Sequence, residues 1–233
     1  MKIAILGTGA GGRCHAAKLL ELGHEVIVGT RDPDATLART APDHMGTPPY
    51  RDWLAAHPGA TVCTFADAAA AADLVINGIS GDHALNALTA IKDQLAGKTL
   101  IDYAVPYVYQ HDSAHKWPTP WGFMPLLDPV DSDSLAEQIQ RALPETRVVK
   151  SFVTQEQETV VDPKSIGGGD HTMFVSGDDE AAKGRAAQLL REYGWTDIVD
   201  LGPLVTARGL EMYAHFHSAV GLALGRRFGV KIV

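Results

Sequence analysis

Four of the six residues in the run Gly7-Thr8-Gly9-Ala10-Gly11-Gly12 are glycines, and their spacing contains the pattern Gly-x-Gly-x-x-Gly. The run follows an apolar segment at 2–6 and precedes an amphipathic segment at 13–22. In such a strand–turn–helix, the first glycine permits a tight turn, the second lets backbone approach a pyrophosphate, and the third lets helix pack on strand. Free N–H groups and the helix dipole then attract the anion. The run therefore predicts a dinucleotide-binding site.

The end of the next predicted strand indicates which dinucleotide is bound. An NAD site usually carries an acidic residue about 20 residues past the glycines, but here strand 25–29 is followed by Thr30 and Arg31. A guanidinium can grip a 2′-phosphate through two charge-assisted hydrogen bonds, and Thr30 can add a hydroxyl donor. We interpret Asp32, which precedes Pro33, as a helix N-cap. NADP is favoured over NAD, the alternative being that Arg31 is an ordinary surface charge.

Composition narrows the classes of partner. The 233 residues are 45% hydrophobic and 21% charged, as in an ordinary globular protein, and the net charge of −8 argues against a nucleic-acid or anionic-membrane partner. We expect no membrane span, because no apolar stretch approaches ~20 residues, and no secretory leader, because the first strand begins at residue 2. Cys14 and Cys63 lie in separate predicted elements. We expect both to be buried, unpaired thiols, which fits a cytoplasmic protein.

Strands and helices alternate along the chain, which predicts an α/β fold: a doubly wound, Rossmann-like parallel sheet extended by a small C-terminal α/β portion and a closing helix. We expect an NADP-binding domain over 1–150, and a part over 151–233 that extends the sheet and completes the second-substrate pocket. The predicted strands are 2–6, 25–29, 61–64, 73–77, 99–102, 147–152, 172–176 and 197–200. The predicted helices are 13–22, 50–56, 66–72, 83–95, 134–143, 178–193 and 207–228.

The cofactor should lie across the carboxyl ends of these strands, so loops that follow strands are expected to form the active face. One such loop is 77–83, and another is the long segment 103–131, which contains Trp117 and Trp121. Its length and aromatic content predict a substrate wall or lid, with subunit contact as the competing interpretation. The proline-rich segment 39–60 either folds over the adenine side of the cofactor or is a passive insertion.

Few residues suggest acid–base chemistry. His83 follows a strand at the active face and could relay a proton, although it could equally begin a helix. Tyr103 and Tyr107 are alternative proton donors, and Lys150 could touch a substrate carboxylate or serve only structure. We expect no metal site, although His111 and His115 have helical spacing. Neither a nucleophile elbow nor a P-loop lysine occurs, so acyl and phosphoryl transfer have no support.

Together these segments resemble the NADP-dependent oxidoreductases that reduce or oxidise the deazaflavin coenzyme F420. The matching stretches are 7–12, 23–31, 177–183, 200–211 and 228–232, which run from one end of the chain to the other. The resemblance implies that hydride passes directly between two stacked ring systems. Catalysis would then be mostly alignment, and the cofactors would carry the hard chemistry.

The resemblance also implies roles for individual residues. It places Thr8, Gly9 and Ala10 on the pyrophosphate and Thr30 and Arg31 on the 2′-phosphate. It further places Ile79 and Ser80 beside the cofactor ribose, and Ala104, Val105 and Pro106 in the nicotinamide pocket.

The first hypothesis is therefore a cytoplasmic NADP-dependent oxidoreductase with a deazaflavin or flavin-like hydride acceptor. One alternative is an NADPH-dependent reductase of a small carbonyl or imine, in which His83 or a tyrosine donates the proton. The other is a non-catalytic NADP-sensing protein that docks a partner through the tryptophan-rich loop. A homodimer is expected because small apolar residues fill 219–224 in the closing helix.

Overall fold

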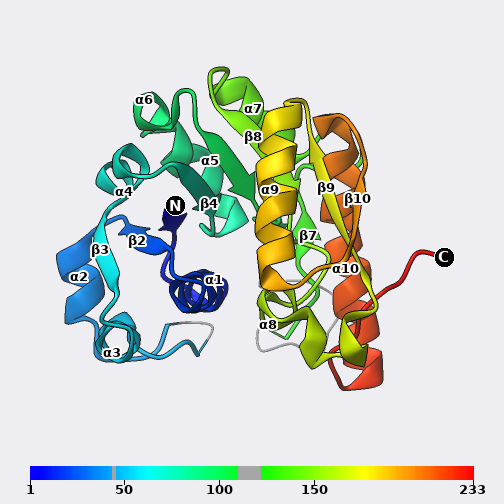
Figure 1. Cartoon of the computed structure of the whole chain (residues 1–233), viewed down its shortest axis with the longest axis horizontal. Coiled ribbons are helices and arrows are strands. Elements are labelled where there is room, and N and C mark those ends of the chain that lie inside the picture. The colour runs from blue at the N-terminus through cyan, green and yellow to red at the C-terminus, as the bar shows by residue number, and fades with distance from the viewer. Residues whose placement is uncertain (44–45, 110–121) are drawn as a thin grey trace.

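A single mostly parallel sheet organises the chain. The computed structural model describes residues 1–43, 46–109 and 122–233, and within them eight strands form a sheet of order β10-β9-β8-β5-β4-β1-β2-β3 (Figure 1). The pairs are parallel except β8–β9, which is antiparallel. The strands are β1 (Lys2–Leu6), β2 (Glu25–Thr30), β3 (Ala60–Thr64), β4 (Leu74–Asn77), β5 (Thr99–Asp102), β8 (Arg147–Ser151), β9 (Thr172–Gly177) and β10 (Asp197–Asp200).

Helices cover both faces of the sheet, which confirms the predicted doubly wound α/β architecture. Strand side chains alternate between faces: Ile3 and Ile5 pack with α1 and α9, whereas Ala4 and Leu6 pack with α4, α5 and α7. The α-helices are α1 (Ala10–Glu21), α2 (Pro33–Ala38), α3 (Tyr50–Ala56), α4 (Phe65–Ala71), α5 (Gly81–Thr89), α6 (Lys92–Leu95), α7 (Leu135–Ala142), α8 (Gln157–Val161), α9 (Glu180–Tyr193) and α10 (Ala207–Leu224). The 3₁₀-helices are η1 (Pro163–Ser165), η2 (Gly167–Gly169) and η3 (Leu204–Thr206).

Local signals explain several helix ends. The Asp32 carboxylate accepts from the Ala35 N–H at 2.9 Å, which confirms Asp32 as the N-cap of α2. Ser134 and Asp179 cap α7 and α9 in the same way. At the other end, Gly194 and Gly225 adopt left-handed φ values of 106° and 61° and terminate α9 and α10.

Four predicted features differ in the structure. The helix expected over 83–95 is split into α5 and α6, because Ile91 leaves helical geometry at φ −121°. The expected closing helix to 228 stops at Leu224. The segment between β8 and β9, where no helix is predicted, contains α8, η1 and η2, and the loop after β5 contains a two-stranded ribbon of β6 (Tyr107–Val108) and β7 (Leu126–Leu127).

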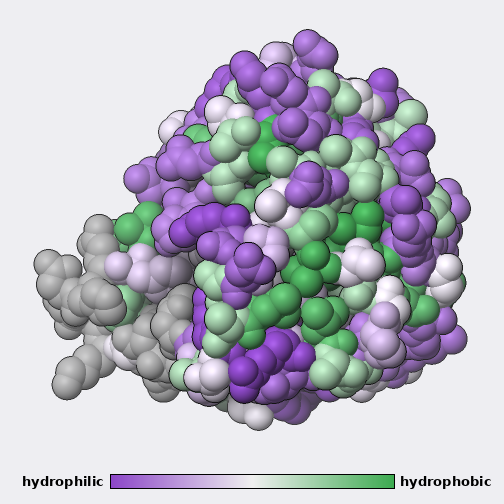
Figure 2. Space-filling model, turned by 90° about the vertical axis from the view of Figure 1, so that its left-hand side faces the viewer, coloured by the Kyte–Doolittle hydropathy of each residue, from purple (hydrophilic) through white to green (hydrophobic). Residues whose placement is uncertain are grey.

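The edge strand β3 lies beside α2 and α3 at one end of the sheet (Figure 1). Viewed from that side, apolar side chains form a band between hydrophilic regions (Figure 2). Leu37, Trp53 and Val62 are partly buried hydrophobic residues of these elements. Cys14 and Cys63 are free, as expected, but both are half-buried rather than fully enclosed. No helix in the described ranges combines the length and hydropathy of a membrane span.

Candidate active site

The glycine run forms the turn between β1 and α1. Gly7 has a φ of +123°, and a Cβ there would collide with the carbonyl oxygen of Gly78 after β4. A Cβ on Gly12 would collide with the Gly7 carbonyl, so both glycines permit backbone-to-backbone contact. A Cβ on Gly9 would meet no atom within 4 Å. Gly9 therefore borders open space, where a ligand can approach the main chain.

The N-terminus of α1 points donors toward this space. Gly9 is the N-cap and provides no side-chain cap, and the first turn contains no acidic residue. The N–H groups of that turn are therefore available to an anion, with the positive end of the helix dipole behind them. Arg13 steadies the turn from within the helix, since its Nε donates to the Thr8 carbonyl at 2.8 Å.

Gly11 serves packing rather than ligand access. A Cβ on Gly11 would press on the Tyr103 hydroxyl and on the Gln157 side chain. His15, one helical turn further on, is fully buried in the same region, with Nε2 at 2.9 Å from Gln157 Oε1 and Nδ1 at 3.0 Å from the Tyr193 hydroxyl. Burial lowers the pKa of His15 to about 4. The glycine turn therefore rests on a neutral, hydrogen-bonded interior.

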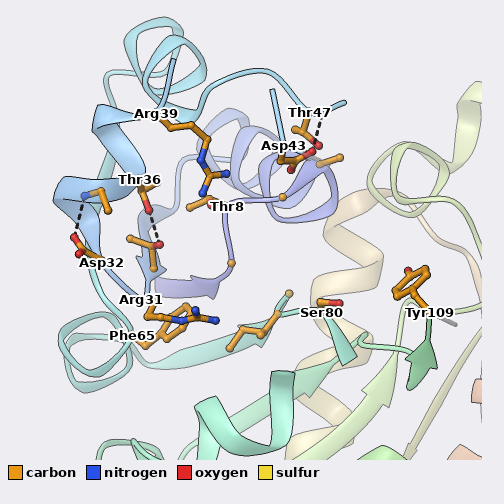
Figure 3. Close-up of a pocket in the computed structure, with 17 residues that line it drawn as sticks. Thr8, Arg31, Asp32, Thr36, Arg39, Asp43, Thr47, Phe65, Ser80 and Tyr109 are labelled. Atoms are coloured by element: carbon orange, nitrogen blue, oxygen red, sulfur yellow. Dashed lines mark hydrogen bonds between the residues drawn. The ribbon is translucent and has the colours of Figure 1, made fainter. Parts of the chain in front are cut away.

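A cleft of about 580 Å³ begins at this turn and runs along the carboxyl ends of the strands (Figure 3). In Figure 3, Asp32 and Thr36 lie at one end, and Ser80 and Tyr109 at the other. Its lining residues are Gly7, Thr8, Gly9, Ala10, Thr30, Arg31, Asp32, Ala35, Thr36, Arg39, Asp43, Thr47, Phe65, Gly78, Ile79, Ser80 and Tyr109. The structure therefore brings eight sequence-predicted site residues to one cleft: Gly7, Thr8, Gly9, Ala10, Thr30, Arg31, Ile79 and Ser80.

Two guanidiniums enter the cleft beyond β2. Arg31 and Arg39 approach it from opposite sides in Figure 3, and neither forms a hydrogen bond or ion pair with the described residues. Thr30 is only 7% exposed, and its hydroxyl lies 2.8 Å from that of Thr36. Only one of the two hydroxyl protons is used in this hydrogen bond, so the other is free to donate to a ligand. Sequence reasoning missed Arg39, whose only signal was a second arginine shortly after the first.

The loops after β4 and β5 are joined by buried polar groups. Asn77 Nδ2 donates to Asp102 Oδ1 at 2.7 Å, and Asn77 Oδ1 accepts from the Ile79 N–H at 3.2 Å. The same Asp102 oxygen accepts from the Ala104 N–H at 3.2 Å. Because the Val105 carbonyl packs directly on Gly81, the two loops also touch through backbone. Among the described residues, Ala104, Val105 and Pro106 lie beside this cleft and not on its lining.

Lys150 lies beneath these loops and is completely buried. Its Nζ donates to Asp102 Oδ2 at 2.7 Å, to Glu211 Oε1 at 2.8 Å, and to the Ala104 carbonyl. Burial alone lowers the pKa of Lys150, but the Asp102 and Glu211 carboxylates more than offset this and raise it above its ordinary value. The lysine therefore stays charged, and it has no hydrogen left for a substrate.

His83 stands apart from the cleft. Its side chain is 62% exposed on the first turn of α5, with Asp82 at 3.7 Å. It lines a neighbouring hollow of about 610 Å³ whose other walls include Arg31, Phe65 and Asn86. Arg31 and Phe65 border both spaces, so the hollow that His83 lines adjoins the cleft at these two residues.

Two further sequence predictions concern a metal site and the long aromatic loop. Within the described residues, no three His, Cys, Asp or Glu side chains gather as a metal ion requires. His215 and His217 lie on α10 with different neighbours: His215 stacks with Tyr107 and His217 with Phe228. His111, His115, Trp117 and Trp121 lie outside the described residues.

Comparison with known proteins places this cleft in a family. Residues 2–106 match the model of the family described as NADP oxidoreductase, coenzyme F420-dependent. The F420-dependent NADP reductase of Methanothermobacter marburgensis is 31% identical over 215 residues, which cover 91% of this chain and 88% of that protein. The chain belongs to the coenzyme F420-dependent NADP oxidoreductase family.

Two further related proteins differ in how much of their own length this chain covers. The crystal structure of a protein from Arthrobacter sp. FB24, provisionally named an F420-dependent NADP-reductase, superposes with a TM-score of 0.90 at 47% identity, covering 100% of this chain and 99% of that one. Metalloreductase STEAP3 of Rattus norvegicus is 26% identical over 212 residues, or 90% of this chain. The chain spans only 36% of the length of STEAP3.

The cleft fits the phosphorylated dinucleotide that the family name implies. Gly9 has empty space where a side chain would stand, and the α1 N-terminus has N–H groups to donate. The carboxylates of Asp32 and Asp43, which also border the cleft, already accept from the Ala35 and Thr47 N–H groups. The unpartnered guanidiniums are thus the charges best placed to meet a phosphate monoester.

Proposed function

We propose that this chain transfers hydride between NADP(H) and the deazaflavin coenzyme F420. The observation that carries the cofactor assignment is the pair of guanidiniums, Arg31 and Arg39, which border the cleft and form no hydrogen bond or ion pair with the residues that the structure describes. Kinship over nearly the whole length with a protein named F420-dependent NADP reductase supports the acceptor. A single charged hydrogen bond contributes about 1.5–3 kcal/mol, enough to discriminate NADP from NAD.

In this proposal each part of the cleft binds one part of the cofactor. Thr8, Gly9 and Ala10 hold the pyrophosphate against the α1 N-terminus, while Gly7, Gly11 and Gly12 shape that turn. Thr30, Arg31 and Arg39 hold the 2′-phosphate, with Thr36 orienting the Thr30 hydroxyl. Ile79 and Ser80 border the ribose on the far side, and Ala104, Val105 and Pro106 flank the nicotinamide pocket, with Tyr109 at its rim.

The protein's part in the reaction is alignment. When bound, NADPH supplies the hydride and a deazaflavin accepts it, so the transfer itself needs no side-chain nucleophile. The chain binds the adenosine end through charge and fixes the loops after β4 and β5 through Asn77 and Asp102. This arrangement assigns no proton transfer to His83, whose place beside Arg31 fits a contact at the adenosine end.

The two alternatives have less support. Reduction of a small carbonyl or imine needs a proton donor at the nicotinamide end, and His83 lines a different hollow. Tyr103, packed between Gly11 and Gly78, is a stronger candidate for such a donor by position, but burial raises its pKa. Family membership favours the F420 reductase over both.

We further propose that residues 1–150 bind the dinucleotide and residues 151–233 complete the acceptor side, and that the protein works in the cytoplasm as a homodimer. Supporting the dimer, Met212 and Phe216 of α10 are exposed hydrophobic side chains, with small residues further along the same helix. Sedimentation of the purified protein tests the dimer independently of activity.

The main experiment combines binding with turnover. Calorimetric titration should show NADPH binding much more tightly than NADH, and oxidation of NADPH, followed by absorbance, should require added F420. A panel of FMN, small carbonyls and cyclic imines provides the controls. Turnover with a carbonyl or imine in preference to F420 would favour the first alternative, and NADPH binding without turnover on any acceptor would favour the sensor. No binding of either dinucleotide would refute the proposal.

A further inference from the structure

One face of α10 carries polar residues that contact the body of the protein. Arg208, Glu211 and His215 are spaced three and four residues apart, so they share that face. Arg208 forms a two-fold hydrogen-bonded pair with Glu137 of α7, at 2.8 and 2.9 Å. His215 Nε2 lies 2.5 Å from the Pro125 carbonyl, next to the β6–β7 ribbon. Glu211, between them, is directed into the interior.

Glu211 completes a closed set of buried hydrogen bonds. Its Oε2 accepts from the Leu135 N–H at 2.9 Å, and its Oε1 accepts from the Ala136 N–H at 3.2 Å and from Lys150 Nζ at 2.8 Å. The three Lys150 donors go to Glu211, Asp102 and the Ala104 carbonyl. Two carboxylates around one ammonium leave a surplus negative charge, which backbone N–H groups and the N-terminal dipole of α7 offset.

The same set of bonds reaches the cofactor cleft. Asp102 receives Lys150 on one oxygen and the Ala104 N–H on the other, while Asn77 links Asp102 to the Ile79 N–H. Ile79 lines the cleft, and Ala104 lies in the loop that follows β5. Glu211 is therefore connected to the Ile79 N–H through four consecutive contacts and to the Ala104 carbonyl through two.

We propose that Glu211 and Lys150 are positioning residues for hydride transfer: from the C-terminal helix they fix the backbone at Ile79 and Ala104, which sets the angle and distance of the nicotinamide. The inference rests on the proposed function. The residues proposed to bind the adenosine end of NADPH do not belong to this hydrogen-bonded set. Cofactor binding and hydride transfer should therefore respond separately to substitution. Loss of Glu211 should therefore slow the chemistry while NADPH still binds.

The chain offers a matched control for purely structural effects. The Arg208–Glu137 pair joins the same two helices, α10 and α7, but within the described residues neither side chain hydrogen-bonds to Asp102, Asn77, Ile79 or Ala104. If Glu211 only held α10 against α7, removing either connection would have similar consequences. If Glu211 positions the loops, only its removal should change hydride transfer.

The test compares Glu211→Gln with Arg208→Gln. In Glu211→Gln an amide NH₂ must replace either Oε1, which faces Lys150 and the Ala136 N–H, or Oε2, which faces the Leu135 N–H, so one or two contacts of the set are lost. We expect kcat with NADPH and F420 to fall about tenfold or more, with the NADPH dissociation constant within about twofold of the wild type. Without any ligand, hydrogen–deuterium exchange at Ile79 and Ala104 should accelerate. Arg208→Gln should leave all three quantities near wild type.

Asn77→Leu provides a second variant that leaves no unpaired charge, in case Glu211→Gln does not fold. It removes both hydrogen bonds of the Asn77 side chain, to Asp102 and to the Ile79 N–H, and leaves the Lys150 and Ala104 contacts of Asp102 in place. We expect the same fall in kcat with NADPH affinity retained. Unchanged kcat and unchanged exchange in either folded variant would overturn the proposal, as would an equal effect in Arg208→Gln. Failure of the proposed function is recognised separately, since the wild type itself would then bind no NADPH or reduce no F420.

Discussion

At the end of the cleft beyond β2, Arg31 and Arg39 present guanidiniums that have no hydrogen-bond or ion-pair partner among the described residues, whereas every Lys150 donor beneath the loops after β4 and β5 is already used. The first kind of group is free to bind a ligand, because no internal bond must break. The second kind cannot bind a ligand, but it fixes the backbone around one. In the proposed function, exposed residues therefore supply the affinity for the cofactor, and buried residues supply its alignment.

The difference also concerns what each residue contributes to folding. An exposed arginine that awaits a phosphate adds little to the stability of the free protein. A buried ion pair is costly to break, because removing one partner leaves the other charge without compensation. The four predictions below use this contrast and run from the largest expected change in free energy to the smallest.

Replacing Lys150 by Met should destabilise the folded chain by about 3–5 kcal/mol, because Asp102 and Glu211 would remain as buried, uncompensated carboxylates. Urea unfolding followed by circular dichroism measures the change. Lys2→Met is the control, since Lys2 pairs with Glu25 at the surface and should change stability by about 1 kcal/mol or less. Equal effects of the two substitutions would show that the buried Lys150 charge and its two carboxylates do not stabilise the fold as described.

Acid should destabilise the protein through His15. Folding holds the pKa of His15 at about 4, below the unfolded value of 6.5, so between these pH values the unfolded chain binds more protons. Stability from this source is complete above pH 6.5 and is lost as the pH falls toward 4, by about 3 kcal/mol in all.

The measurement is the free energy of unfolding in urea at about pH 4.5 and about pH 7.5. His15→Gln should flatten the pH dependence, whatever it does to stability at the higher pH. His83→Gln, at an exposed position, should leave the slope unchanged. A wild-type protein as stable at the lower pH as at the higher would contradict the neutral, buried state of His15.

Arg31→Ala should weaken NADPH binding by about 1.5–3 kcal/mol and NADH binding far less, because a charged hydrogen bond to the 2′-phosphate is lost. Arg39→Ala should act in the same direction. Arg51→Ala is the control, since Arg51 lies on α3 beside Asp52 and does not line the cleft. Calorimetry with both dinucleotides is the appropriate measurement, and an equal loss for NADPH and NADH would remove the arginines from phosphate recognition.

His83→Ala should have the smallest effect, with kcat within about threefold of wild type, or less than about 0.7 kcal/mol. The reason is its position in the neighbouring hollow beside Arg31. Steady-state kinetics with F420 measure the change. A fall of two orders of magnitude or more would mean that His83 does reach the reacting atoms and would revive the carbonyl or imine alternative.

Local patterns in the sequence were sufficient for the parts of the fold that depend on neighbouring residues. The glycine run, the Asp32 cap and the short α3 were all predictable, since each depends on a few consecutive residues. The break between α5 and α6 was not, because neither Gly nor Pro marks Ile91. The antiparallel direction of β9 was also missed, because hydrophobic periodicity carries no information on strand direction.

The candidate site likewise contains residues that local sequence patterns do not reveal. Arg31 was found because it directly follows a strand, whereas Arg39 reaches the cleft only through the path of the chain after α2. Lys150 could be recognised as unusual, but its partners, Asp102 and Glu211, lie 48 and 61 residues away in the sequence. Only tertiary structure brings such groups together, so no local motif could have predicted the network.

The distance in sequence between Lys150 and Glu211 has a consequence during synthesis of the chain on the ribosome. Lys150 is synthesised 61 residues before Glu211, a delay of about 3–12 s at a translation rate of roughly 5–20 residues per second. During this interval the nascent chain already has its glycine turn and both arginines, but the ammonium has one carboxylate instead of two. Chains that end before Glu211 would therefore contain the residues that line the cleft but lack one of the two carboxylates that compensate the Lys150 charge.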